Sequence, residues 1–126
     1  MPDQALTNSE IVAAYRERTP GSEQEAARAA KALPSGIAHD GRKCDPYGIY
    51  VVRAEGARKW DVDGNEYVDH FGGHGALLLG HNHPTVLAAA QDALNLGTHF
   101  GSNHPREVRW AELVQEMVPR DRKSVV

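Results

Sequence analysis

The sequence contains a single cysteine, Cys44, among its 126 residues. One cysteine cannot form a disulfide within the chain, and it cannot build a zinc site from several cysteines. Scarce cysteine is typical of proteins in a reducing compartment, so we expect a cytoplasmic location. No histidine can be assigned as a partner base of Cys44, so we also expect an unreactive thiol.

Long apolar runs and clusters of basic residues are missing as well. Purely apolar runs such as residues 76–79 are far shorter than the roughly 20 residues of a membrane-spanning helix. The first ten residues contain acidic side chains and no apolar core, which is unlike a secretory signal. The formal net charge is −3. We therefore expect neither a membrane nor a nucleic acid as a partner.

The composition is that of an ordinary globular protein, with 40% apolar and 25% charged residues. Its length suggests one domain. Residues 8–33 are rich in helix formers, and Thr19-Pro20-Gly21 divides them into two helices. Ser22 and Glu25 have the spacing of a capping box, which predicts that the second helix starts at Ser22. The alanine-rich second helix needs a partner surface, because such helices are weak alone.

A change of pattern follows a loop over residues 34–49, which is rich in proline and glycine. Short β-like runs are then separated by Glu55-Gly56 and by Asp63-Gly64, two typical hairpin signals. We predict a three-stranded antiparallel meander over residues 49–69. In this meander Trp60 and Tyr67 are expected to pack, not to bind a ligand.

Two further helices are expected after the glycine-rich stretch FGGHGALLLGHNHP. The first begins at Pro84 and ends near Gly97, and the second follows the break GTHFGSNHP. Each has a modest apolar face, formed by Val86, Leu87, Ala90 and Leu94 in the first and by Val108, Ala111, Val114, Met117 and Val118 in the second. The predicted fold class is α+β, with a core too small for a closed domain and a final SVV that resembles the start of a strand.

Six of the seven histidines lie between residues 70 and 104, close to Asp69. Imidazoles and carboxylates bind zinc or nickel, so a metal site is one interpretation. The spacings match no known ligand pattern, however, and nothing supplies a third ligand beside His81 and His83. We therefore favour the alternative, in which these histidines lie in loops and form hydrogen bonds with the backbone.

Three other patterns resemble functional motifs but have simpler explanations. FGGHG could hold a phosphate, but ALLLGHN separates it from the next helix, so a tight turn is favoured. The DVDG turn at residues 61–64 lacks the further ligands of a calcium loop, so it is expected to be a hairpin turn. The lysines all stand in polar surroundings, and none is a good candidate for Schiff-base chemistry; they are Lys31, Lys43, Lys59 and Lys123.

Four segments in order resemble the class III, fold-type-I enzymes that depend on pyridoxal phosphate (PLP). They are LPSGIAHDGRK, YVVRAEGARKWDVDGNEYVDH, GALLLGHNHPTV, and GTHFGSNHPREV with AELVQEMVP. The family includes aminotransferases and glutamate-1-semialdehyde aminomutase, and the resemblance covers roughly residues 22–119. It implies a helical arm at residues 1–33. Residues 34–126 would then be a small-domain segment and the start of the large PLP-binding domain.

The family's main cofactor residues have no counterpart in this sequence. Such proteins continue with a Ser-Gly-Thr turn that holds the cofactor phosphate, an aspartate that pairs with the pyridine nitrogen, and the lysine that binds the cofactor covalently. The resemblance therefore implies an N-terminal fragment that is inactive alone. We assign no catalytic and no cofactor-binding residue, although the full-length family uses PLP.

The resemblance also supplies candidate substrate-binding residues. Gly73 and His74 fall where the aminomutase has serine and tryptophan, and His99 falls where it has serine, while Phe100 and Gly101 match its Phe-Gly pair. The histidines favour an aminotransferase acting on another amine or amino acid, with the aminomutase as the alternative. An alternative explanation is that these residues only shape their loops.

The implied partners are a small-molecule amino donor and acceptor, together with a second copy of the chain as a homodimer. A different class of protein stays open as the rival interpretation, namely a small non-catalytic metal-binding or interaction protein rich in histidine. That rival predicts cooperative unfolding that zinc or nickel shifts upward. A fragment predicts poor solubility or a molten state with exposed apolar surface.

Overall fold

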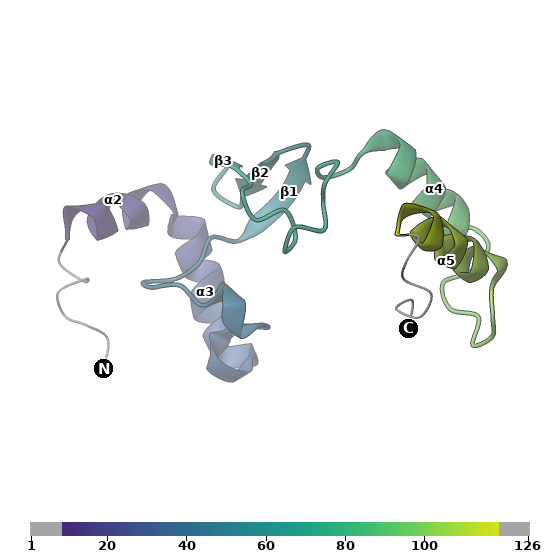
Figure 1. The fold of residues 1–126 in the computed structure, drawn as a ribbon. Helices are drawn as coiled ribbons and strands as arrows, with labels where there is room; N and C mark the ends of the chain where they lie inside the picture. Colours follow the sequence, from purple (N-terminus) through teal and green to yellow (C-terminus); the bar gives the residue numbers. More distant parts are fainter. Residues whose placement is uncertain (1–8, 119–126) are drawn as a thin grey trace. The chain divides into compact units, whose positions relative to one another are not determined.

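The computed structural model describes residues 9–118 (Figure 1). The chain divides into two compact units, one up to Pro84 and one from Thr85. The first unit contains two helices and a small sheet, and the second contains a pair of helices. Between residues 9 and 118, no helix combines the length and the apolar character required to cross a membrane.

Two helices open the chain, as predicted, and they meet at Thr19. Helix α2 spans Glu10–Arg18 and is capped by Ser9, whose hydroxyl accepts a hydrogen bond from the Val12 N–H at 3.1 Å. Helix α3 spans Pro20–Ala32 and has Thr19 as its N-cap residue. The predicted start at Ser22 was therefore wrong, because proline at the first helical position begins the helix two residues earlier.

The N-terminus of α3 is capped from a distant part of the chain. Thr19 makes no side-chain capping bond. Instead, the carboxylate of Asp63 accepts hydrogen bonds from the N–H groups of Gly21 and Ser22, at 2.5 and 3.0 Å. Ser22 is fully buried, and its hydroxyl accepts a bond from the Tyr50 N–H instead of capping the helix. The negative charge of Asp63 also interacts favourably with the positive, N-terminal end of the helix dipole.

The predicted meander is confirmed. Strands β1 (Val51–Glu55), β2 (Arg58–Asp61) and β3 (Glu66–Val68) form an antiparallel sheet in that order. Arg53 pairs with Trp60 and Val51 pairs with Asp61, so an irregularity interrupts the register between Val51 and Arg53. The guanidinium of Arg53 lies 3.5 Å from the centre of the Trp60 ring, which confirms Trp60 as a packing residue.

Asp61 organises the turn between β2 and β3. Its side chain is almost fully buried and accepts hydrogen bonds from the N–H groups of Asp63 and Asn65 and from the hydroxyl of Tyr67. Burial alone would raise the pKa of this carboxyl, but the bonds from Asn65 and Tyr67 outweigh burial and lower its pKa. This carboxylate therefore serves the hairpin turn, as expected.

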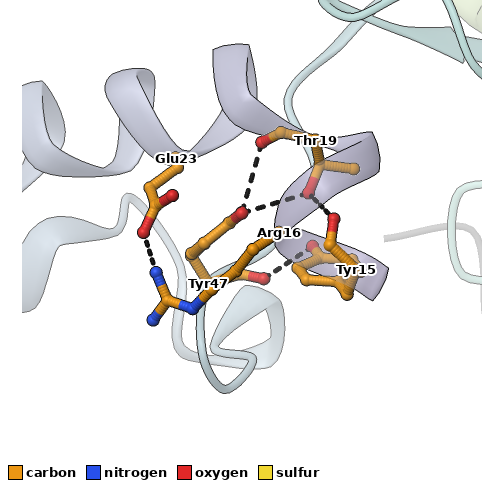
Figure 2. A network of polar contacts seen from close by, with 5 residues as sticks. All are labelled: Tyr15, Arg16, Thr19, Glu23 and Tyr47. Atoms are coloured by element: carbon orange, nitrogen blue, oxygen red, sulfur yellow. Dashed lines mark hydrogen bonds and ion pairs between the residues drawn. The ribbon is translucent and has the colours of Figure 1, made fainter. Parts of the chain in front are cut away.

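The segment between α3 and β1 is mostly loop, as predicted, with two short 3₁₀ turns, η1 (Pro34–Gly36) and η2 (Asp40–Arg42). Its anchor is Tyr47, which is only 7% exposed. The Tyr47 hydroxyl donates to the Thr19 carbonyl at 3.3 Å and lies 3.1 Å from the Thr19 hydroxyl, which donates to the Tyr15 carbonyl (Figure 2). The Tyr15 hydroxyl donates in turn to the Tyr47 carbonyl at 2.7 Å. Arg16 and Glu23 form an ion pair beside this network.

The second unit contains helices α4 (Pro84–Leu94) and α5 (Pro105–Met117), both where they were predicted. Helix α4 ends before Gly97, whose N–H donates to the Leu94 carbonyl and closes a final turn. The imidazole of His104 caps α5 by accepting a hydrogen bond from the Arg106 N–H at 3.1 Å. The expectation that loop histidines bond to the backbone is thus confirmed at His104.

Large apolar side chains remain exposed in both units. Among the described residues, Tyr47 is the one hydrophobic residue that is buried. On α4 and α5, the apolar faces predicted from the sequence are open to solvent, at Val86, Leu87, Leu94, Val108 and Met117. The order of helices, meander and helices confirms the predicted fold class, including its small core.

Candidate functional site

The candidate residues Gly73 and His74 lie in a glycine-rich loop that follows the meander. Gly72, Gly73, His74 and Gly75 all have positive φ angles, between 51 and 81°. Glycine adopts this conformation freely, whereas histidine at φ 61° needs support from its surroundings. Hydrogen bonds from Gly75 to Phe71 and from Leu77 to Gly72 hold the tight turn together. The structure therefore confirms the turn predicted for FGGHG.

Two aromatic rings stand next to the His74 imidazole. The Phe71 ring packs edge-on against it, with the ring centres 4.4 Å apart. The imidazole of His39, from the loop before the meander, lies 6.1 Å away at a steep angle. His39 accepts a hydrogen bond from the Gly41 N–H through Nδ1, so its neutral form carries the proton on Nε2. His39 lies 35 residues upstream of His74, and no local pattern in the sequence pointed to this pairing.

A polar cluster closes the base of the loop. One oxygen of Asp69 accepts hydrogen bonds from Lys59 Nζ at 3.1 Å and from the Phe71 N–H at 3.0 Å. The other oxygen lies 2.7 Å from Nε2 of His81. These bonds, with that from His81 the strongest, hold the pKa of the Asp69 carboxyl far below its ordinary value. Asp69 is therefore ionised under ordinary conditions, and its side chain is only 6% exposed.

Backbone contacts fasten the same base to the first hairpin. Gly56 and His81 exchange two N–H to carbonyl hydrogen bonds, at 2.8 and 2.9 Å. Asn82 donates from its side chain to the Ala54 carbonyl. A Cβ atom on Gly80 would lie 2.7 Å from the Gly56 carbonyl oxygen, so only glycine fits there without a shift. The chain thus returns to the meander at residues 80–82, directly beside the hairpin turn.

The remaining candidates, His99, Phe100 and Gly101, belong to the second unit. The Phe100 ring stacks on His104 with the ring centres 5.2 Å apart and the planes 16° from parallel. Gly101 has a φ angle of 62°. A shallow surface hollow beside the start of α5 is lined by neighbours of these residues, including His104, Pro105 and Val108, but not by the candidates themselves. Their role in substrate binding stays a prediction.

Several of the groups that could bind a cofactor already have partners within the chain. Of the backbone N–H groups in the glycine-rich loop, those of Gly75, Ala76, Leu77 and Gly80 are already bonded within the loop, so they cannot cradle a phosphate. The ammonium of Lys59 is paired with Asp69. Within residues 9–118, no three histidine, cysteine or acidic side chains gather closely enough to hold a metal ion.

The fold is that of the N-terminal part of fold-type-I PLP transaminases. A solved ω-transaminase from Sphaerobacter thermophilus superposes with a TM-score of 0.81 at 32% identity, over 86% of this chain and 25% of the transaminase. A transaminase solved with PLP bound gives a TM-score of 0.75 at 37% identity, over 78% of this chain and 23% of that protein. Residues 40–126 match the family model for class-III aminotransferases. The chain belongs to this family, as the sequence motifs had indicated.

Similar sequences carry the name of the aminomutase within the family. The glutamate-1-semialdehyde 2,1-aminomutase of Methanopyrus kandleri is 38% identical over 109 residues, which are 86% of this chain and 25% of that protein. Glutamate-1-semialdehyde 2,1-aminomutase 2 of Brevibacillus brevis is 44% identical over 101 residues, or 78% of this chain and 24% of that protein. The chain spans about a quarter of the length of these curated relatives.

Proposed function

We propose that this chain supplies substrate-facing loops to a class III aminotransferase. The reaction would transfer an amino group between an amino acid or amine and a keto or aldehyde acceptor. The observation that carries the proposal is the match of residues 40–126 to the family. The proposed protein is cytoplasmic and homodimeric, with residues 1–33 as a helical arm and residues 34–126 as the small-domain segment and the start of the large domain.

In this proposal the loop around His74 faces the substrate. The His74 side chain is exposed, and the rings of Phe71 and His39 lie near its imidazole. A neutral imidazole donates one hydrogen bond and accepts another, so His74 is suited to a substrate carboxylate or carbonyl. Gly73 adopts the left-handed conformation that the turn requires, with a φ angle of 60°. His99, Phe100 and Gly101 are proposed as further walls of the substrate pocket.

PLP supplies the electron sink for amino-group transfer when it is bound. Because Lys59 is paired with Asp69 and the sequence places no lysine in apolar surroundings, we assign the covalent step to residues of the full-length family that this chain lacks. We expect the 126-residue chain alone to show no transaminase activity with any amino donor. Borohydride reduction in the presence of PLP, followed by peptide mapping, would show no specifically labelled lysine; stoichiometric labelling of one lysine would contradict the proposal.

A second candidate function is that of the aminomutase, which the names of similar sequences favour. His74 and His99 argue for the aminotransferase instead, because they replace the tryptophan and serine of the aminomutase. An imidazole changes both the size and the hydrogen bonding of a substrate pocket. The two candidates therefore predict different substrates for the same loops.

A chimera tests the proposal and separates the two candidates. The aligned segment of the Brevibacillus brevis relative would be replaced by the corresponding residues of this chain, and PLP content would confirm folding. We expect transfer from amino donors to a keto acid and little aminomutase activity. In that chimera His74→Phe should lower kcat/KM at least about tenfold, which corresponds to about 1.4 kcal/mol.

The matched control is His70→Phe, in the same loop, where the histidine side chain is exposed like that of His74. This variant should keep kcat/KM close to that of the parent chimera. An unchanged kcat/KM of His74→Phe for every amino donor would contradict the role of His74. A chimera that binds PLP but converts only the aminomutase substrate would favour the second candidate.

A further inference from the structure

The loop from Asp69 to His81 has its two ends held side by side. Asp69 follows β3 directly, and its carboxylate reaches Nε2 of His81 at 2.7 Å, across twelve positions of the sequence. A compact surface loop with adjacent ends is an Ω-loop. In such a loop, the contacts between the ends decide how the tip is oriented on the rest of the protein.

Each contact at this base joins a different part of the structure. Lys59 belongs to β2 and binds one Asp69 oxygen, while His81 binds the other. The Phe71 N–H donates to the same carboxylate from inside the loop. The backbone of His81 is paired with Gly56 in the first hairpin turn. Asp69 and His81 therefore connect the start of the loop, its end and the meander.

The tip of the loop has little other support. Leu78 is 92% exposed, and Leu79 and Phe71 are more than half exposed, so no large apolar side chain of the loop is fully buried. Its internal hydrogen bonds are short-range turns, which bend the loop but do not attach it to the sheet. Among residues 9–118, His74 is the one aromatic residue of this loop whose ring lies near a ring from another segment, that of His39.

We propose that Asp69 and His81 are positioning residues, which clamp the base of this loop and thereby hold Gly73 and His74 in one orientation toward the substrate. The substrate part of this inference rests on the proposed function, whereas the clamp itself does not. The carboxylate acts through His81 and Lys59 and touches no substrate. The clamp keeps the loop ordered before substrate arrives. Substrate binding therefore loses no free energy to ordering the loop.

The clamp is tested by hydrogen exchange, followed by mass spectrometry, on the chimera, in which the residues that follow this segment in the relative are present. His81→Leu removes the donor to Asp69, whereas His81→Gln retains an amide donor at about the position of Nε2. Losing a hydrogen bond to a charged group should raise amide exchange in residues 70–80 by roughly tenfold or more. We expect this rise in His81→Leu, with exchange in β1–β3 unchanged, and exchange near the parent rate in His81→Gln and in the control His70→Leu.

Three outcomes would overturn the clamp. Exchange in residues 70–80 could stay the same in His81→Leu, or the meander could lose protection to the same extent as the loop, which would make the histidine a general structural residue. The two His81 variants could also behave alike, which would exclude the hydrogen bond as the cause. A parent chimera whose loop already exchanges freely would count against the clamp in the same way.

The positioning role is then measured in the active chimera. We expect His81→Leu to raise KM or lower kcat while PLP content stays constant, and His81→Gln to restore most of the loss. A loosened loop with unchanged kcat and KM would overturn the positioning role. An inactive parent chimera would overturn the proposed function instead, and the exchange measurements would still decide the clamp.

Discussion

Asp61 and Asp63 lie in one hairpin turn and bind quite different partners. Asp61 points into the turn and binds Asn65 and Tyr67, whereas Asp63 reaches out to the first N–H groups of α3. Both side chains accept hydrogen bonds, but only Asp63 links two distant elements. At the scale of single residues, these carboxylates give two direct tests of the structure.

The first test removes the cap of α3. Asp63→Ala should destabilise the helix by about 0.5–2 kcal/mol, the usual cost of losing an N-terminal cap. Amide exchange in α3, followed by NMR, should become faster, most of all in its first turns. Asp92→Ala changes an exposed aspartate in α4 and serves as the control. Equal exchange in α3 for both variants would contradict the capping role of Asp63.

The second test follows the ionisation of Tyr67. Burial and the bond to the Asp61 carboxylate raise the pKa of Tyr67 to about 12. Because the folded pKa lies above the ordinary value of about 10, the stabilisation is complete below pH 10 and is lost as the pH rises toward 12. An absorbance titration of the phenolate should show this high step, and Tyr67→Phe should remove it.

Asp61→Asn provides the complementary change. Without the negative charge of Asp61, the pKa of Tyr67 should move back toward the ordinary tyrosine value, because the neutral phenol loses its charged acceptor. A high-pH step that persists unchanged in Asp61→Asn would show that burial alone, and not this hydrogen bond, raises the pKa.

At the scale of elements, the glycine-rich loop is built around one close contact. Gly80 passes so near Gly56 that a Cβ atom would lie 2.7 Å from a carbonyl oxygen, whereas a Cβ atom on Gly75 would meet nothing within 4 Å. Both glycines have φ angles near 80°, at 79 and 81°. The two positions therefore separate the effect of a clash from the effect of backbone conformation.

Alanine at the two positions should have unequal effects. Gly75→Ala should cost about 1–2 kcal/mol from the left-handed conformation alone. Gly80→Ala should cost more and should break the bonds between Gly56 and His81, because the backbones must move apart. Amide exchange at Gly56 and His81 would report the difference, and similar protection of these amides in both variants would contradict the close contact.

Local patterns predicted most of the elements correctly. The hairpin turns Glu55-Gly56 and Asp63-Gly64 lie where the sheet turns, and α4 and α5 begin at Pro84 and Pro105. Each of these signals depends only on neighbouring residues, which the sequence displays directly. The capping box at Ser22 failed because the spacing of serine and glutamate says nothing about the proline that had already started the helix.

Such local patterns could not predict the contacts that shape the candidate site. Asp63 caps a helix 42 residues upstream, and Asp69 meets His81 across a whole loop. His39 approaches His74 from a segment with no motif of its own. These pairings depend on how the chain folds back on itself. The family resemblance indicated Gly73 and His74 as candidate substrate-binding residues, but it did not predict the contacts that position their loop.

At the scale of the whole molecule, the dominant feature of residues 9–118 is the exposed apolar surface of both units. Large hydrophobic side chains are exposed on α4, on α5 and on β1, where Val51 and Val52 are 46 and 64% exposed. A domain of ordinary stability buries such residues, because their burial drives folding. In the first unit, hydrogen bonds link distant segments, such as those of Asp63 with α3 and of Tyr15 with Tyr47.

We therefore expect the 126-residue chain to melt gradually and to bind a dye such as ANS strongly. Circular dichroism would follow the melt with and without zinc, and zinc should leave it unchanged. A sharp transition that zinc moves upward would contradict this prediction, since a metal bound to the folded state stabilises it by mass action. That outcome would favour the metal-binding alternative.

The distant cap of α3 also determines the order in which the chain acquires its structure during synthesis. Helix α3 leaves the ribosome well before Asp63, and its 13 residues are rich in alanine, so it is marginal alone. At 5–20 residues per second, Asp63 follows the end of the helix after roughly 2–6 s. We therefore expect the nascent helix to become stable only after the hairpin turn with Asp63 has formed. The earlier part of the chain would then fold onto the meander.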